Sequence, residues 1–326
     1  MTAVLVTGGA GYIGSVVADQ LLARRHDVVV LDDLSTGHRA AVPSGVTFVQ
    51  GGIGDRAALD ALFDQHRVGA IVHLAAFALV EESVKNPEKY RRNNVAAAQV
   101  LLDAALTAGV RRFVFSSSCT VYGYPPVVPI PEDAPLAPVS PYGETKLAFE
   151  RVLGTYASQH GLSSVTLRYF NASGATELRG EDHDPESHLI PNVLGVALGK
   201  KSAVDVFGTD YPTPDGTAVR DYIHVDDLAD AHVRALDVPS NGAIALNLGT
   251  GLGSSVRQVV EAARRITGHA IPVTDRARRP GDPPELVAAP HRAATVLGWR
   301  PRRSSLEEIL GSAWRWHRAH PRGYRT

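Results

Sequence analysis

A glycine-rich turn near the start of the chain constrains the fold more than any other feature. Residues 3–7 are an apolar run with too few residues for a helix, and they lead directly into the sequence GGAGYIG at residues 8–14. A helical pattern follows at 16–25, and a second apolar run at 27–31 ends at Asp32. Strand, turn, helix and strand in this order are the setting in which such a turn belongs to a parallel α/β sheet.

The chemistry of this turn points to a dinucleotide. Glycines let the chain turn tightly, let the backbone approach a pyrophosphate and let the helix pack closely on the sheet, while the helix N-terminus offers the positive end of its dipole. The carboxylate of Asp32 accepts hydrogen bonds from a ribose diol and repels a 2′-phosphate. Because no Arg lies beside Asp32, the sequence favours NAD over NADP.

The rest of the first half continues this pattern. Apolar runs at 46–50, 70–74, 111–115 and 164–169 alternate with helical stretches. Buried strands that alternate with helices predict a sheet covered on both faces, so the expected fold class is α/β, a Rossmann-type doubly wound parallel sheet. The predicted helix at 94–108 is apolar over much of its circumference, which indicates burial in this core or against another subunit.

The pattern loosens after about residue 175. Gly, Pro and Asp accumulate at 175–185 and 208–216, and long loops inside a compact protein are usually functional. We therefore expect residues 1–175 to form an NAD-binding domain, with later segments returning to it, and residues 176–326 to form mainly a smaller, mixed α/β substrate lobe. The elements expected after residue 175 are helices at 190–198, from 226, at 255–267, at 292–297 and at 306–318, and strands at 204–207 and 245–248.

A second motif lies at the start of a predicted helix. Ser140 suits an N-cap and Pro141 suits the first helical position, so the helix is expected to begin there. Tyr142 and Lys146 are then one turn apart on one face. A nearby cation favours the phenolate and lowers the pKa of a phenol from about 10, so the pair is predicted to form a base. The alternative is an ordinary surface pair, but only five of the 33 basic residues are Lys.

Composition excludes several classes of function. The 326 residues have a net charge of −1 and a pI of about 6.9. The chain therefore has no excess of positive charge that would indicate binding to nucleic acid or to an anionic membrane. The sole cysteine, Cys119, rules out an internal disulfide and is interpreted as a small buried residue rather than a nucleophile. Arg300, Arg302 and Arg303 are interpreted as a solvated surface run. With no signal-peptide pattern and no apolar run of roughly 18 residues, a cytoplasmic protein is expected, without a metal site.

Longer motifs carry a resemblance to a known family. They are TGGAGYIG at 7–14, FSSSCTVYG at 115–123, PYGETK at 141–146, LRYFN at 167–171, FGTDYPTPDGT at 207–217 and VRDYIHV at 219–225. From end to end, the chain resembles the extended short-chain dehydrogenase/reductase family. The last two segments are similar to the UDP-sugar 4-epimerases within it, whereas the glycine-rich turn and the Tyr–Lys pair mark only the family as a whole.

The resemblance implies an NAD-dependent epimerase of a UDP-sugar. Tyr142 would be the base, Lys146 would lower the pKa of its phenol and hold the nicotinamide ribose, and Ser118 would bond the sugar 4-hydroxyl. Ser116 and Tyr169 would pack about the nicotinamide. The full set of implied cofactor contacts is Gly8, Gly11, Tyr12, Ile13, Gly14, Asp32, Asp33, Ile53, Leu74, Ala75, Asn93, Ser116, Tyr142, Lys146 and Tyr169.

The resemblance also implies a substrate site and a homodimer. Asn171, Leu189 and Arg220 would hold the diphosphate, Phe207 would lie against the uracil, and Arg279 with Asp282 would grip the uridine end. Leu286 stands where the bulk of the residue gates the sugar 2-substituent. The full substrate set is Ser118, Tyr142, Asn171, Leu189, Phe207, Arg220, Arg279, Asp282 and Leu286. Dimerisation is allowed by the predicted helix at 95–108 and by the helix that carries Lys146.

Two features separate this reading from its alternatives. Dehydratases on the same scaffold need an acid/base pair after the Ser, where this chain has Cys119 and Thr120, and non-catalytic binders typically lose the Tyr or Lys that this chain keeps. A UDP-hexuronate or UDP-N-acetylglucosamine 4-epimerase remains an alternative. One departure concerns the cofactor, because Gly52 stands where relatives carry an Asp that meets the adenine.

Overall fold

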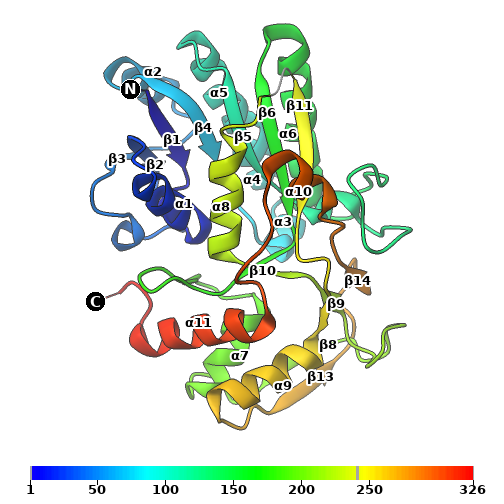
Figure 1. Ribbon diagram of the computed structural model, residues 1–326. Coiled ribbons are helices and arrows are strands. Elements are labelled where there is room, and N and C mark those ends of the chain that lie inside the picture. Colours follow the sequence, from blue (N-terminus) through cyan, green and yellow to red (C-terminus); the bar gives the residue numbers. More distant parts are fainter. Residues whose placement is uncertain (1, 240–241, 326) are drawn as a thin grey trace.

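A seven-stranded parallel sheet forms the centre of the computed structural model, which describes residues 2–239 and 242–325 (Figure 1). Its strands are β1 (Ala3–Thr7), β2 (Val28–Asp32), β3 (Thr47–Gln50), β4 (Val68–His73), β5 (Arg112–Ser118), β6 (Ser163–Tyr169) and β11 (Ala243–Leu248). They pair in the order β3-β2-β1-β4-β5-β6-β11, and every pair is parallel. The Rossmann-type doubly wound fold expected from the sequence is therefore confirmed.

Helices cover both faces of this sheet (Figure 1). One face carries α1 (Tyr12–Ala23), α8 (Val225–Ala235) and α10 (His291–Leu297), and the other carries α2 (Arg56–Gln65), α5 (Ala98–Thr107) and α6 (Pro141–His160). Strands between two helical layers are apolar on both sides, and all residues of β2, VVVLD, are buried. The unbroken apolar runs of the sequence have this physical origin.

The apolar helix expected at 94–108 lies in this core. It consists of a π-helical turn, η2 (Arg92–Ala97), followed by α5. Leu101, Leu102 and Ala105 of α5 are buried in the cluster between the sheet and its helices. The sequence allowed burial in the core or against another subunit, and these three side chains occupy the core.

The strand order reverses between β1 and β4. From β1 the chain winds outward through β2 and β3, then crosses back to β4 on the other side of β1. At this end of the two strands, the backbone N–H of Leu74, just after β4, donates to the carbonyl of Thr7, the last residue of β1, at 3.0 Å. Doubly wound sheets bind ligands in the crevice at such a reversal, at the carboxyl ends of the strands. The glycine-rich turn leaves β1 at this crevice.

The lower part of the molecule has an apolar core of its own, built from α7 (Leu189–Ala197), α9 (Val256–Thr267), α11 (Leu306–Ala319) and β8 (Val204–Phe207). Strand β13 (Val273–Arg276) pairs with β8. Between this lobe and the sheet, β7 (Asn171–Ser173) pairs with β10 (Tyr222–His224), and β9 (Val219–Arg220) lies between β12 (Ser254–Ser255) and β14 (Glu285–Leu286). The remaining short helices are α3 (Val80–Lys85), α4 (Pro87–Arg91), η1 (Arg39–Ala41) and η3 (Cys119–Tyr122).

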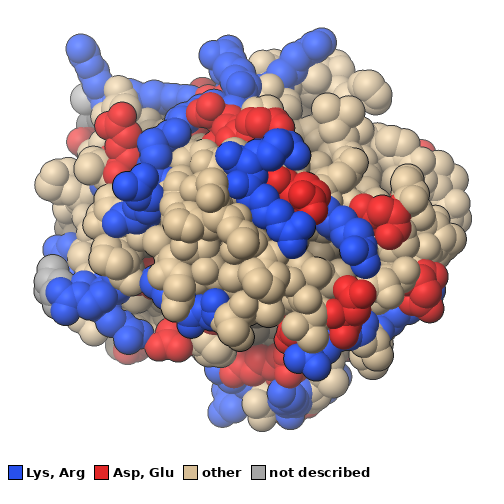
Figure 2. Space-filling model, turned by 90° about the horizontal axis from the view of Figure 1, so that it is seen from below, with Lys and Arg blue, Asp and Glu red and all other residues tan. Residues whose placement is uncertain are grey.

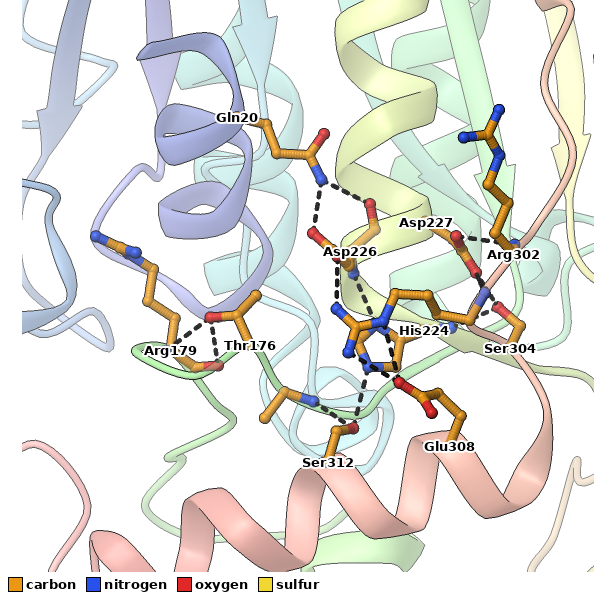
Figure 3. Close-up of polar contacts among 12 residues, drawn as sticks. Gln20, Thr176, Arg179, His224, Asp226, Asp227, Arg302, Ser304, Glu308 and Ser312 are labelled. Atoms are coloured by element: carbon orange, nitrogen blue, oxygen red, sulfur yellow. Dashed lines mark hydrogen bonds and ion pairs between the residues drawn. The ribbon is translucent and has the colours of Figure 1, made fainter. Parts of the chain in front are cut away.

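Polar side chains join the sheet helices to α11 (Figure 3). Gln20 of α1 donates to the backbone oxygen and the carboxylate of Asp226, at 2.9 and 2.7 Å. The guanidinium of Arg303 lies between Asp226, at 2.8 Å, and Glu308 of α11, at 2.9 Å. Arg303 of the arginine run at 300–303 is thus solvated, with 39% of its side chain exposed, and it also connects α8 with α11.

The outer face of the lobe carries charges of both signs. Figure 2 shows Lys and Arg side chains interspersed with Asp and Glu across this face. Several form ion pairs, such as Arg276 with Asp205 at 2.9 Å and Arg278 with Asp210 at 2.8 Å. Within the described residues, no helix combines the length and the apolar character needed to cross a membrane.

Candidate active site

The glycine-rich turn has no room for side chains. Gly8 has a φ of 73°, in the region that favours glycine, and a Cβ there would lie 2.7 Å from the backbone nitrogen of Ala75. A Cβ at Gly14 would lie 2.1 Å from the carbonyl oxygen of Gly8. The two glycines therefore let the turn touch the backbone after β4 on one side and helix α1 on the other.

The first turn of α1 is open to an anion. Its N-cap, Gly11, has no side chain to cap the helix, and the first turn contains no acidic residue. The backbone N–H groups of Tyr12, Ile13 and Gly14 thus lack a side-chain acceptor at the positive end of the helix dipole. The Tyr12 phenol donates to the carbonyl of Gly174 at 2.6 Å. A turn of this kind fits a pyrophosphate.

A pocket beside this turn brings together five of the other predicted cofactor residues. Asp32, Asp33, Ile53, Ala75 and Asn93 all belong to its wall. The complete lining is Leu31, Asp32, Asp33, Ser35, Thr36, Gly51, Gly52, Ile53, Ala75, Ala76, Phe77 and Asn93. This lining includes no Lys or Arg to attract a 2′-phosphate, which agrees with the preference for NAD inferred from Asp32.

Backbone groups fix the carboxylate of Asp32. It accepts hydrogen bonds from the N–H of Ala10 at 2.9 Å and from the N–H of Leu34 at 2.8 Å. Burial raises the pKa of this carboxyl, and the two hydrogen bonds oppose that shift. Each carboxylate oxygen can accept more than one hydrogen bond, so Asp32 is oriented by the fold and still able to accept from a ribose.

The helix that carries the predicted base begins as the sequence indicates. Ser140 caps α6 by accepting a hydrogen bond from the N–H of Gly143 at 3.2 Å, and Pro141 occupies the first position. Tyr142 and Lys146 both lie on the buried side of the helix, with 7% and 3% of their surface exposed. The interpretation of the two as an ordinary surface pair is therefore wrong.

Lys146 and Ser118 both lie beside the Tyr142 ring. The ammonium of Lys146 donates to the carbonyl of Ser116 at 2.8 Å and lies 5.7 Å from the centre of the Tyr142 ring. Ser118, two residues along the same face of β5, interacts with the Tyr142 phenol. Tyr169 stands opposite Ser118 on the neighbouring strand β6. The structure thus gathers the predicted catalytic residues in one buried group.

Burial dominates the electrostatics of this group. It raises the pKa of Tyr142 well above the usual range, an effect that Tyr169 reinforces and Ser118 opposes. Burial also lowers the pKa of Lys146 to about 7, against the attraction of Glu150. Desolvation thus disfavours the charge on both groups and opposes the effect predicted for Lys146 on the phenol. That Lys146 lowers the pKa of Tyr142 stays a prediction.

Three residues behind this group escaped the sequence analysis. His232 of α8 places Nε2 2.7 Å from the hydroxyl of Ser116. Arg168 of β6 pairs with Glu150 of α6 at 2.6 Å, and both are buried. Glu150 follows Lys146 by four residues on the same helix, so that spacing was an available signal. No such signal pointed to His232, because α8 and β5 lie far apart in the sequence.

The predicted substrate residues form two pairs in the lobe. Arg220 forms an ion pair with Asp282, and its guanidinium also donates to the carbonyl of Pro283 at 2.9 Å. The guanidinium of Arg279 lies 3.9 Å from the centre of the Phe207 ring, a cation–π distance. Both guanidinium groups are thereby held in place before any anion arrives.

Leu286 lies close to the residues that follow Ser118. It sits opposite Arg220, where β14 pairs with β9, and it packs in an apolar cluster with Cys119 and Phe170. Burial raises the pKa of the Cys119 thiol to about 12, which agrees with a packing role rather than a nucleophilic one.

The two remaining predicted substrate residues lie at the starts of elements. Asn171 begins β7, where its N–H donates to the carbonyl of Asp221 at 2.9 Å. Leu189 is the first residue of α7, after an N-cap residue, His188, that makes no side-chain capping bond. The backbone N–H groups of this helix end therefore lack a side-chain cap at the N-cap position.

Four ionisable residues cluster just before α7. Glu181, His183, Glu186 and His188 bring possible metal-ligand atoms within 4.8 Å of one another. Nδ1 of His188 lies 2.7 Å from Glu181 and 3.0 Å from Glu186, whereas two ligands of one tetrahedral zinc lie about 3.3 Å apart at bond lengths near 2.0 Å. These are hydrogen-bond lengths, so the four residues form an ion cluster. The absence of a metal site stays a prediction.

Comparison with known proteins supplies the family. Residues 4–249 match the model of the NAD dependent epimerase/dehydratase family. The chain belongs to this family. Among similar epimerase/dehydratase relatives, the UDP-glucose 4-epimerase of Streptomyces lividans is 51% identical over 98% of this chain and 97% of its own length. The UDP-glucose 4-epimerase of Halalkalibacterium halodurans is 49% identical over 99% of this chain and 98% of its own length.

Solved structures from the epimerase/dehydratase family have the same fold. A crystal structure of a UDP-glucose 4-epimerase superposes with a TM-score of 0.96 at 43% identity and covers 100% of both chains. The Brucella ovis UDP-glucose 4-epimerase, in complex with NAD, has a TM-score of 0.93 at 48% identity over 96% of this chain and 98% of its own. The Bifidobacterium longum UDP-glucose 4-epimerase, in complex with NAD⁺ and UDP, has a TM-score of 0.94 at 37% identity. The match covers 99% of this chain and 100% of its own.

Proposed function

We propose that this chain is a UDP-glucose 4-epimerase that interconverts UDP-galactose and UDP-glucose through a transient 4-keto sugar, with bound NAD. The observation that carries the proposal is the buried group of Tyr142, Lys146 and Ser118, in a chain that matches enzymes of this name over nearly its whole length. The names of these relatives favour this function over a UDP-hexuronate epimerase.

The residues present fit NAD along its whole length. The turn at Gly8, Gly11 and Gly14 would hold the pyrophosphate, because a Cβ at Gly8 or Gly14 would fill the space that the backbone needs. The pocket with Asp32 would hold the adenosine, and Lys146 would hold the nicotinamide ribose. When bound, NAD would supply a nicotinamide ring that can accept and return a hydride.

The chemistry requires a base and a hydride acceptor together. A hydrogen on an alcohol carbon without an adjacent acidifying group does not leave readily as a proton, so it must leave with its electrons while a base takes the hydroxyl proton. Ser118 would bond the 4-hydroxyl and Tyr142 would accept its proton. Tyr142 returns this proton when the opposite face of the 4-keto sugar is reduced, so the base is regenerated in each turnover.

The lobe would hold the part of the substrate that does not react. Arg220 and Arg279 present guanidinium groups, which suit phosphate oxygens, and both are positioned in advance by their neighbours. With the uridine diphosphate held, the keto sugar is free to turn about its phosphate linkage and to present its other face. Asn171, Leu189 and Phe207 are proposed to complete this clamp.

One experiment tests the proposal directly. Purified protein is incubated with UDP-galactose, without added NAD, and the nucleotide sugars are resolved by chromatography. UDP-glucose should appear in more than a stoichiometric amount, because the cofactor is regenerated in each cycle. A dehydrogenase would stop after one turnover, and a non-catalytic binder would leave the substrate unchanged. Either of these outcomes contradicts the proposal.

A further inference from the structure

His232 connects helix α8 with the catalytic strand through a buried hydrogen-bond chain. The imidazole is fully buried. Its Nδ1 lies 2.8 Å from the carbonyl of Leu228, one turn earlier on α8, and its Nε2 lies 2.7 Å from the hydroxyl of Ser116. Ser116 is the residue whose carbonyl holds the ammonium of Lys146.

The chemistry of the partners gives these hydrogen bonds a direction. A carbonyl oxygen only accepts, so Nδ1 of His232 carries the proton in its bond to Leu228. Burial lowers the pKa of His232 to about 4, which leaves Nε2 unprotonated at neutral pH. Nε2 is therefore an acceptor, and the hydroxyl of Ser116 must donate to it.

The donor role of Ser116 fixes its side chain against α8. A serine hydroxyl has one proton, and that of Ser116 is committed to His232. The ring of Tyr169 packs near that of His232, with centroids 6.2 Å apart.

We propose that His232 is a positioning residue for the 4-epimerase reaction, because it holds the Ser116 side chain and thereby the peptide whose carbonyl binds the ammonium of Lys146. This inference rests on the proposed function. Without the hydrogen bond from Ser116 to His232, the Ser116 peptide is free to shift, and the ammonium of Lys146 shifts with it.

Two substitutions at His232 separate its two hydrogen bonds. His232→Gln extends an amide oxygen to about the position of Nε2, so it keeps an acceptor for Ser116. His232→Asn reaches only the position of Nδ1, so it keeps the bond to Leu228 and loses the bond to Ser116. Since misplacement of a catalytic group by about 1 Å costs on the order of 100-fold in rate, kcat should fall roughly 10- to 100-fold in the Asn variant. It should stay within about threefold of wild type in the Gln variant, with KM for UDP-galactose unchanged in both.

The proposal also predicts non-additivity. Ser116→Ala removes the donor, so adding His232→Asn to it should lower kcat little further. His224 supplies a matched control, because it is also buried on the same segment and also faces a serine, with Nε2 3.0 Å from Ser312 (Figure 3). His224→Asn should lower the melting temperature and leave kcat and KM unchanged.

The outcomes are distinguishable. A wild-type kcat in His232→Asn would overturn the proposal, as would an equal loss of kcat in the Gln and Asn variants, which would indicate a packing role. Failure of the wild-type protein to convert UDP-galactose would contradict the proposed function instead. In that case the imidazole ¹⁵N shifts of His232 still test the hydrogen-bond chain, which requires the Nδ1-protonated neutral form at pH 7.

Discussion

Gly52 leaves room in the cofactor pocket for a larger side chain. A Cβ added there would meet no atom within 4 Å, and Gly52 lines the same pocket as Asp32. We predict that Gly52→Asp folds normally and binds NAD about fivefold more tightly, since one net hydrogen bond contributes about 1 kcal/mol. Isothermal titration of the cofactor-free protein with NAD measures the change. Gly14→Ala is the contrasting control, because its Cβ would lie 2.1 Å from a carbonyl oxygen, and it should bind poorly or fail to fold.

Leu286 sets the predicted limit on the sugar. Its side chain packs beside Cys119, and its bulk is intermediate between a tyrosine and a small residue. We predict partial turnover of UDP-N-acetylglucosamine, and Leu286→Tyr should reduce the ratio of kcat/KM for this sugar to that for UDP-glucose by roughly 10- to 100-fold. The ratio within one variant corrects for any loss of folded protein. No detectable wild-type activity on the acetylated sugar would refute the idea.

Residues whose position follows from local spacing could be placed from the sequence, while their roles stay predictions. The order of strand, turn and helix located Gly8 and Gly14 within a few positions. The predicted start of a helix located Tyr142 in the same way. The pairing of Arg220 with Asp282 and the contact of His232 with Ser116 were not found, because each joins segments that are far apart in the chain. The burial of Tyr142, which raises the pKa of its phenol, was not foreseen for a related reason, since burial depends on the whole fold and not on the neighbouring lysine.

The ion cluster before α7 makes stability depend on pH. Although burial opposes it, bonding to Glu181 and Glu186 raises the pKa of His183 to about 9, and the same bonding raises the pKa of His188. A pKa that is raised in the folded state contributes stability. This contribution is complete below the unfolded-state pKa of about 6.5 and is lost as the pH rises through 9. The melting temperature should therefore fall between pH 7 and 10.

Two variants test whether the cluster causes this fall. His183→Gln and His188→Gln remove the titrating groups, so the melting temperature of each should be lower at pH 6 and should change less between pH 7 and 10 than that of the wild type. The comparison variant is His66→Gln, at the C-terminal end of α2 and outside the cluster, which should reproduce the wild-type profile. A wild-type melting temperature that is flat between pH 7 and 10 would contradict the prediction.

One buried carboxylate joins the start of α8 to the segment before α11. Asp227 accepts hydrogen bonds from the N–H groups of Arg302 and Arg303, at 3.0 and 2.9 Å, and from the hydroxyl of Ser304, at 2.6 Å (Figure 3). We predict that Asp227→Ala lowers the free energy of unfolding by about 3 kcal/mol, because hydrogen bonds to a charged group contribute about 1.5–3 kcal/mol each. Arg303→Ala breaks only partly exposed ion pairs and should cost at most about 1 kcal/mol. Chemical denaturation compares the two, and equal losses would show the assignment to be wrong.

Elements were predicted well where they are long and less well where they are short. The sequence placed the strands of the central sheet and helices α6, α9 and α11 within a few residues. Each of these elements is long enough for its apolar residues to show the run or the spacing of a strand or a helix. Strands β7, β9, β10, β12 and β14 were not predicted. Each has two or three residues, too few to show a period, and each exists only because its partner lies alongside.

The whole molecule is predicted to be a homodimer. Tyr156 of α6 donates to Asp103 of α5 at 2.6 Å, so the two helices lie side by side with exposed residues such as Ala96 next to them. Light scattering after gel filtration should give twice the chain mass of 34.7 kDa. Ala96→Arg should shift the mass toward that of one chain, whereas Ala40→Arg, at an exposed site on another side of the sheet, should not. A wild-type mass of one chain would refute the prediction.

The architecture as a whole was predictable, but the path of the chain through it was only partly so. Alternating strands and helices sufficed to predict the doubly wound sheet. The expectation that late segments return to the first domain agrees with the position of β11 next to β6, while the division at residue 175 stays a prediction. Which late strand returns, and on which edge, depends on long-range packing that no local pattern encodes.

The late position of β11 has a consequence during synthesis. Until residue 248 has left the ribosome, β6 is an edge strand with unpaired backbone groups, and such edges readily pair with other chains. At about 5–20 residues per second, that edge stays uncovered for on the order of ten seconds after β6 has emerged. The nascent protein is therefore most exposed to aggregation late in translation, which is when a chaperone that shields strand edges would improve its yield most.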